Sequence, residues 1–159
     1  MATRHEGPHG DHPRSTAQIG GHPIHPMLVP FPIVCFVFTL VVDIVFLKTG
    51  DPIWADASRW LLGIGIVMAA LAATTGLIDF MGDDRIRRMS VAIQHMLANV
   101  TVVVVEIINL VTRLRNDDGI GGLGVYLSAA AVLILLFSGW RGGDLVFRHG
   151  VGVRDASNL

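Results

Sequence analysis

The stretch MLVPFPIVCFVFTLVVDIVFL, residues 27–47, decides the fold class. Asp43 is its only charged residue, and an α-helix of this length crosses the roughly 30 Å hydrocarbon core of a bilayer. A strand of a membrane barrel would be shorter and would alternate in polarity. A helix of a soluble bundle would keep a charged outer face, which this stretch lacks. The stretch therefore predicts a transmembrane helix.

Three further apolar segments of similar length follow, at residues 60–80, 91–114 and 120–140. Charged residues make up only 16% of the chain, well below the usual share in soluble domains. The sequence thus predicts an all-α membrane protein with four transmembrane helices in residues 19–153. Residues 1–18 read as a disordered polar tail, rich in Gly, Pro and His, and residues 154–159 as a short C-terminal tail.

The connections between these segments are short and polar, so sequential helices should be antiparallel neighbours in an up-down bundle with both termini on one side. Basic residues are unevenly divided between the two sides. The terminal side holds Arg4, Arg14, Arg85, Arg87, Arg88, Arg141, Arg148 and Arg154, and the opposite side holds Lys48, Arg59, Arg113 and Arg115. Because basic residues favour the cytoplasmic side, the termini are expected inside. Arg113 is near a helix end, where its long side chain could snorkel to the membrane interface.

The predicted topology brings polar residues from four separate stretches of the chain to one end of the bundle. These residues are His22, His25, Asp79, His95, Asp144 and His149. Ionisable groups at membrane depth usually face the bundle interior or a water-filled cavity. Since histidine is the commonest metal ligand, this set predicts a metal site, a haem site or a proton path.

Each of these residues also has a plainer interpretation. His22 and His25 could be interfacial residues at a helix start, and His95 could bond across helices. His149 could be a surface residue, and the two aspartates could pair with nearby arginines. A second polar set, Asp43, Glu106 and Asn109, lies deeper and is either a structural hydrogen-bonded group or part of a proton relay.

Several motifs are similar to those of a known family. The stretches GHPIHPMLVPFP (residues 21–32) and SGWRGGDLVFRHGVGV (residues 138–153) are the most specific, and GLIDF (residues 76–80) and the pair His95/Asn99 accompany them. Together they resemble the bacterial membrane family catalogued as domain of unknown function 2231. The resemblance implies a four-helix domain in the bacterial inner membrane, with no established activity. Some relatives are joined to Rieske-type iron–sulfur domains, which points to redox chemistry.

The first functional hypothesis is a haem b-binding electron carrier. His95 would be one axial ligand, because it alone lies within a helix, and His25 or His149 would be the other. Arg141 and Arg148 lie on the side where they could pair with the haem propionates.

Two other hypotheses remain open. One is a non-haem divalent metal site or transporter built from His22, His25, Asp79, His95, Asp144 and His149. The other is a cofactor-free subunit whose polar end docks a membrane or redox partner. An enzyme is not favoured, because no hydrolytic or transferase motif is present and the glycines of residues 119–124 lack the Gly-Lys-Ser/Thr of a phosphate loop. The near-neutral net charge of −1 gives no indication of nucleic-acid binding.

Overall fold

Four helical segments are long and apolar enough to cross a membrane. The computed structural model describes residues 12–13, 15–116 and 119–153. Within these residues the four segments are Ile24–Thr49, Pro52–Gly82, Ser90–Arg115 and Ile120–Phe147. The all-α fold class and the four spanning helices predicted from the sequence are confirmed.

The elements follow the chain without a large loop. In order they are β1 (Gln18–Ile19), β2 (His22–Pro23), α1 (Ile24–Leu28), α2 (Pro30–Thr49), α3 (Pro52–Gly82), α4 (Asp84–Arg87), α5 (Ser90–Arg115), η1 (Ile120–Gly124) and α6 (Val125–Phe147). The two short strands pair as an antiparallel hairpin. The helical stretch η1 is kinked at Gly122 and continues directly into α6.

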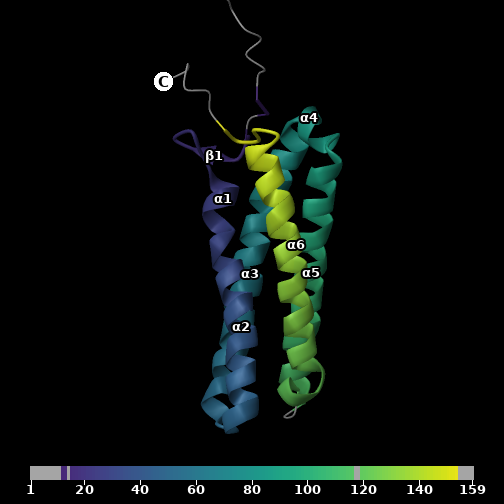
Figure 1. The fold of residues 1–159 in the computed structure, drawn as a ribbon. Coiled ribbons are helices and arrows are strands. Elements are labelled where there is room, and N and C mark those ends of the chain that lie inside the picture. Colours follow the sequence, from purple (N-terminus) through teal and green to yellow (C-terminus); the bar gives the residue numbers. More distant parts are fainter. Residues whose placement is uncertain (1–11, 14, 117–118, 154–159) are drawn as a thin grey trace, which may run out of the picture.

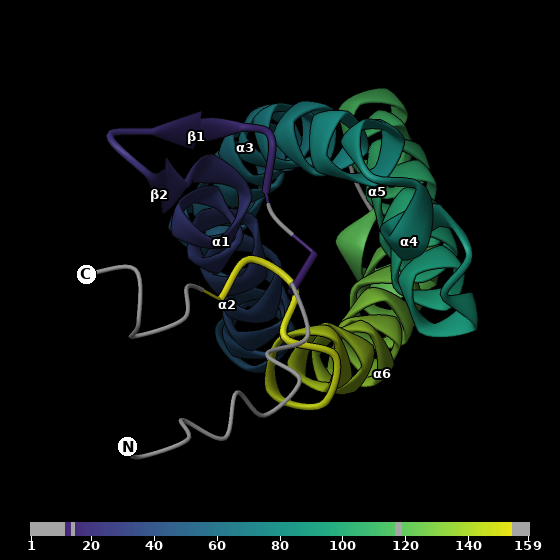
Figure 2. The same ribbon diagram turned by 90° about the horizontal axis from the view of Figure 1, so that it is seen from above.

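The long helices form a ring around a common interior. Seen along the bundle in Figure 2, their order around the ring is α2, α3, α5 and α6. The hairpin, α4 and the C-terminal end of α6 lie at one end, called here the terminal end (Figure 1). The turn between α2 and α3 and the stretch η1 lie at the opposite, far end (Figure 1). Each end therefore collects residues that are distant in the sequence.

The turn at the far end is tighter than the sequence predicted. Gly50 ends α2 in the left-handed conformation, with a φ of 69°, which glycine adopts at little cost. Asp51 then caps α3 by accepting a hydrogen bond from the Ile53 N–H at 3.0 Å, and Pro52 occupies the first turn. The second spanning helix therefore begins at Pro52 rather than near residue 60.

The last helix also runs further than predicted. The apolar segment ends at Trp140, but α6 continues through Gly142 and Gly143 to Phe147. Gly150 follows with a φ of 64°, and its N–H donates to the carbonyl of Val146 at 3.1 Å. This left-handed glycine terminates the helix in the usual way. The extra turns place Gly142 and Asp144 on the helix rather than in a tail.

The outward faces of the helices are apolar. Large hydrophobic side chains on all four spans are at least half exposed, among them Phe38 (52%), Leu71 (51%), Val104 (50%) and Leu136 (68%). A soluble protein of this size does not expose apolar surface all around its girth. The exposed faces are suited to lipid.

A small apolar layer fills the middle of the bundle. It consists of the buried side chains of Phe36, Leu62, Ala69, Val102 and Ala131, contributed by all four spans. Gly65 makes room for the Phe36 ring, because a Cβ at that glycine would lie 2.6 Å from Phe36 Cε1. This apolar layer separates two polar layers, one toward each end of the bundle.

Candidate functional site

Two histidines from different spans meet inside the bundle near the terminal end. The ring centres of His25 on α1 and His95 on α5 are 6.3 Å apart, with an angle of 86° between the ring planes. Both side chains are only partly buried, so part of each imidazole surface is not covered by protein. Of the six polar residues predicted to converge here, these two come into ring contact.

Backbone carbonyls hold both rings in the same way. His25 Nδ1 lies 2.8 Å from the carbonyl oxygen of Ala72 on α3, and His95 Nδ1 lies 2.9 Å from that of Ser138 on α6. Because a carbonyl oxygen only accepts, each Nδ1 carries the proton and donates it. The lone pair of each ring is thereby placed on Nε2. Metal-binding histidines commonly have this tautomer, with Nδ1–H donated to a backbone carbonyl.

Two side chains complete the surroundings of His95. Asn99, one turn further along α5, donates from Nδ2 to the carbonyl of His95 at 2.9 Å and to His95 Nε2 at 3.1 Å. The Ser138 hydroxyl lies 3.1 Å from His95 Nδ1. We call His25, Ala72, His95, Asn99 and Ser138 the histidine layer. The His95/Asn99 pair singled out in the sequence is therefore a direct contact.

Each imidazole rests on a glycine of a neighbouring helix. A Cβ at Gly76 on α3 would lie 2.9 Å from His25 Cε1 and Nδ1, and a Cβ at Gly142 on α6 would lie 3.1 Å from His95 Cε1. Distances this short leave no room for alanine unless the rings move. Gly76 and Gly142 thus have a defined role, which is to admit the two histidines.

The two predicted aspartates have partners of other kinds. Asp79 Oδ1 accepts hydrogen bonds from the backbone N–H groups of Thr16 and Ala17, at 2.8 and 2.7 Å, and from the Ser15 hydroxyl at 2.8 Å. Residues 15–17, which belong to the predicted N-terminal tail, are thus fastened to the end of α3. Asp144 is buried and pairs with Arg148 at 3.1 Å and with Arg141 at 3.4 Å.

His22 and His149 are both exposed, and neither belongs to the ring pair of His25 and His95. In the part of the chain that the structure describes, no three His, Cys, Asp or Glu side chains gather closely enough to hold a metal ion. His5 and His9, like Arg4, Arg14 and Arg154, lie outside the described residues. The assignment of the six residues to a metal site stays a prediction.

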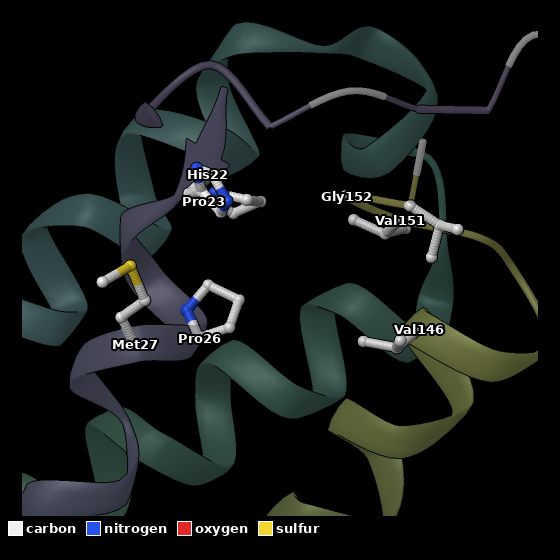
Figure 3. A pocket seen from close by; sticks show the side chains of 8 residues that line it. His22, Pro23, Pro26, Met27, Val146, Val151 and Gly152 are labelled. Atoms are coloured by element: carbon white, nitrogen blue, oxygen red, sulfur yellow. The ribbon is translucent and has the colours of Figure 1, made fainter. Parts of the chain in front are cut away.

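A cavity opens at the terminal end, between the start of the first spanning helix and the end of the last. Its volume is about 380 Å³, and Figure 3 shows its walls, which come from β2, α1 and the end of α6 together with the segment after it. The lining residues are His22, Pro23, Pro26, Met27, Val146, Val151, Gly152 and Val153. Its walls are mostly apolar, and neither His25 nor His95 lines it.

A second polar cluster lies toward the far end and is fully buried. Arg113 on α5 forms a two-pronged ion pair with Asp43 on α2, with Nη1–Oδ1 at 2.5 Å and Nη2–Oδ2 at 2.7 Å. Ser58 on α3 and Ser128 on α6 donate their hydroxyls to the same carboxylate at 2.6 and 2.8 Å. The side chains of the ion pair are 0% exposed.

Asn109 connects this ion pair to a second carboxylate. Its Oδ1 accepts from Arg113 Nε at 2.9 Å, and its Nδ2 donates to Glu106 Oε2 at 2.8 Å. We call Asp43, Ser58, Glu106, Asn109, Arg113 and Ser128 the ionic layer. The expectation that Arg113 can snorkel is wrong, because its guanidinium turns inward and is bound on every side.

One feature of the sequence could have revealed this layer. His95, Asn99, Val102, Glu106, Asn109 and Arg113 recur at alternating intervals of four and three residues along α5. That spacing places them on one face of a helix. An arginine on the same face as Glu106 and Asn109 is directed into the bundle together with them, even though it is near the helix end.

One comparison with known proteins identifies a family, and the other two find no match. The sequence profile of the family described as predicted membrane protein (DUF2231) matches residues 21–155. No curated protein and no solved structure matches the chain significantly. The matched region contains all four spanning helices and both polar layers. The chain therefore belongs to the DUF2231 family of membrane proteins.

Proposed function

We propose that the chain is a membrane electron carrier that binds haem b through His25 and His95 as axial ligands. The observation that carries this proposal is the pairing of two imidazoles from different helices in the bundle interior, 6.3 Å apart, each with its lone pair on Nε2. Four-helix bundle cores are a common location for cofactors held by side chains of facing helices. Haem b held there by the two histidines would supply one-electron redox chemistry.

The number of ligands favours haem over a non-haem ion. A structural or catalytic zinc site takes at least three protein ligands. Haem iron takes four nitrogens from the porphyrin and needs only two from the protein. In the described chain two histidines meet, with no third metal-binding side chain in the cluster. This argues for haem as the group that two histidines can hold.

The 6.3 Å between the two ring centres is also close to the separation expected for two histidines that bind one haem iron. A transition metal binds an imidazole nitrogen at about 2 Å, and that nitrogen is roughly 1 Å from the ring centre, so two axial rings have centres roughly 6 Å apart. Asn99 contacts His95 Nε2 but also donates to the His95 carbonyl. It can give up the first bond and retain the second when Nε2 becomes a ligand.

Two arginines at the terminal end are suited to the propionates. Arg141 has a buried Nε with no hydrogen-bond partner among the described residues, and its pairing with Asp144 is long, at 3.4 Å. Arg148 is 70% exposed. Guanidinium groups bind carboxylates through paired hydrogen bonds. In this proposal His149 is a control residue rather than a ligand, because it is exposed and is not part of the ring pair.

The proposed setting is the bacterial inner membrane with both termini in the cytoplasm. The buried Arg113 no longer counts toward the basic residues of the far side, which leaves Lys48, Arg59 and Arg115 there. The larger number on the terminal side then favours that side as cytoplasmic. A redox protein in or on the membrane would supply and remove the electron at the terminal end.

Visible absorption of the purified protein tests the proposal. The protein is expressed with added haem precursor, purified in detergent, and recorded oxidised and reduced, with metal analysis of the same sample. We expect one haem per chain and a Soret band that sharpens on reduction. His25→Ala and His95→Ala should each abolish bound haem or convert it to a five-coordinate form, whereas the exposed-site controls His22→Ala and His149→Ala should retain the wild-type spectrum.

His25→Met sharpens the experiment, because methionine also ligates haem iron and raises its potential relative to histidine. A bound haem with a higher midpoint potential in this variant would identify His25 as a ligand. A colourless wild-type protein with stoichiometric metal would replace haem by a non-haem ion. A colourless, metal-free protein would leave the partner-binding subunit as the better account.

A further inference from the structure

The ionic layer contains more negative than positive groups. Its charged side chains are Asp43 on α2 and Glu106 and Arg113 on α5, while α3 and α6 contribute the hydroxyls of Ser58 and Ser128. One guanidinium therefore faces two carboxyl groups. Both carboxyls are 0% exposed. With both ionised, the layer would hold an unbalanced negative charge inside the membrane.

Arg113 is committed to Asp43 and has no hydrogen bond left for Glu106. Nη1 binds Asp43 and Ser58, and Nε binds Asn109. Nη2 binds Asp43, Ser128 and the Gly124 carbonyl. Paired carboxylate and guanidinium groups with this geometry are both charged. Asp43 is thus the counter-ion of Arg113.

Glu106 is in a different position. Oε2 accepts a hydrogen bond from Asn109 at 2.8 Å, but Oε1 is buried and has no partner among the described residues. An ionised carboxylate in such a place costs several kcal/mol, and the cost disappears when the group takes up a proton. The neighbouring side chains Val102, Val103 and Val105 on α5 provide no compensating charge.

We propose that Glu106 is a proton-binding site of the bundle, carrying a proton at pH 7 while Asp43 and Arg113 remain ionised. Whether Glu106 carries this proton depends on the neighbouring ion pair of Asp43 and Arg113. When Arg113 loses Asp43, its guanidinium needs a new counter-ion, and Glu106 is the remaining carboxyl of the layer. The proton then leaves Glu106 and the guanidinium charge is balanced again.

This proton site is independent of the proposed haem site. Glu106 follows His95 by 11 positions on α5, about 16 Å along the helix axis. Val102 lies between them on the same helix face, within the apolar layer that includes Phe36 and Leu62. The site therefore stands whether or not the histidines bind a cofactor.

The sequence permits a direct test, because the chain has only two glutamates, Glu6 and Glu106. In a Glu6→Gln background, glutamate labelled with ¹³C at the side-chain carboxyl gives a single carboxyl signal, from Glu106. The full chain is reconstituted into lipid nanodiscs and the carboxyl chemical shift is followed by NMR as the pH is varied. We expect the shift of a neutral carboxylic acid at pH 7 in potassium buffer.

Two variants determine whether the ion pair controls the proton. Asp43→Asn should move the Glu106 signal at pH 7 to that of an ionised carboxylate. The matched control is Asp56→Asn on α3. The Asp56 side chain is 66% exposed and pairs with Arg59 at the surface, so its replacement should leave the Glu106 signal unchanged.

An ionised Glu106 signal in the unaltered background at pH 7 would overturn the proposal. So would a signal that switches to the ionised position on replacing potassium by sodium, since the site would then bind a metal cation in place of a proton. If Asp43→Asn does not fold, the pH titration of the Glu106 signal in the protein with the intact ion pair still decides whether Glu106 holds a proton at pH 7.

Discussion

The two polar layers of the bundle differ in how the central pair of side chains in each layer is bound. In the ionic layer the guanidinium of Arg113 and the carboxylate of Asp43 bind each other and the hydroxyls around them. In the histidine layer only the Nδ1 atoms of His25 and His95 are fixed by carbonyls. The ion pair connects the helices at this level, whereas His25 Nε2 has no hydrogen-bond partner among the described residues and His95 Nε2 has only the Asn99 amide, so these two nitrogens leave capacity for another group. We therefore interpret the ionic layer as mainly structural and the histidine layer as the functional site.

Breaking the ion pair should have the largest effect. Asp43→Ala deprives the buried Arg113 of its paired carboxylate, and balancing the guanidinium then requires Glu106 to lose its proton, so we expect a loss of about 3–5 kcal/mol of stability. The double variant Asp43→Ala/Arg113→Met should recover part of this loss, because it removes both charges. Reversible unfolding in mixed micelles measures the change. Equal stability of Asp43→Ala and wild type would show that the pair does not hold the helices together.

Replacing the glycines that contact the histidine rings should affect the histidine layer selectively. Gly76→Ala places a Cβ 2.9 Å from the His25 ring, so the ring must leave the Ala72 carbonyl or α1 must shift. We expect a cost of about 1–3 kcal/mol and loss of any group bound at the histidines. Gly63→Ala on the same helix is the control, because nothing lies within 4 Å of its added Cβ. Equal ligand content in the two variants would show that the space at Gly76 is not required for binding at the histidines.

Removing the carboxylate that fastens the N-terminal segment should have a local effect. Asp79→Asn keeps the size of the side chain but removes the charge that accepts the N–H groups of Thr16 and Ala17. We expect a loss of about 1–3 kcal/mol, since hydrogen bonds to charged groups are worth more than neutral ones. Hydrogen exchange at residues 15–18 should become faster while the spans stay protected. Faster exchange throughout α3 would contradict a local role.

The surface ion pair gives the smallest expected effect and calibrates the others. Asp56 pairs with Arg59 at 2.9 Å, but its side chain is 66% exposed. Exposed pairs contribute about 0–1 kcal/mol, so Asp56→Asn should change the unfolding free energy by no more than that. A loss as large as that of Asp43→Ala would mean that burial is not what separates the two pairs.

The spanning helices could be predicted because each is a continuous apolar run long enough for a bilayer. The residues at which the helices begin and end were harder to predict. Pro52 begins α3 within a polar stretch because Asp51 caps it, and Phe147 ends α6 beyond two glycines that the helix tolerates. Polarity alone marks where a run leaves the lipid, whereas capping and packing determine where a helix stops.

The candidate site was predicted in part. Topology brought His25 and His95 to the same end, but the carbonyls of Ala72 and Ser138 that orient them depend on packing between helices. Arg113 was misplaced because a basic residue near a helix end usually reaches the interface. Its partner Asp43 is distant in the sequence, so only the shared face of α5 indicated that the guanidinium points inward.

Electron paramagnetic resonance of the oxidised protein tests the central claim, the use of His25 and His95 as paired ligands, most directly. The account predicts a low-spin ferric haem signal from the wild-type protein, because two imidazoles give a strong axial field. His25→Ala should convert this signal to a high-spin one, with His22→Ala as the unchanged control. A wild-type protein that gives no haem signal after expression with added haem precursor, or a low-spin signal that survives both His25→Ala and His95→Ala, would contradict it.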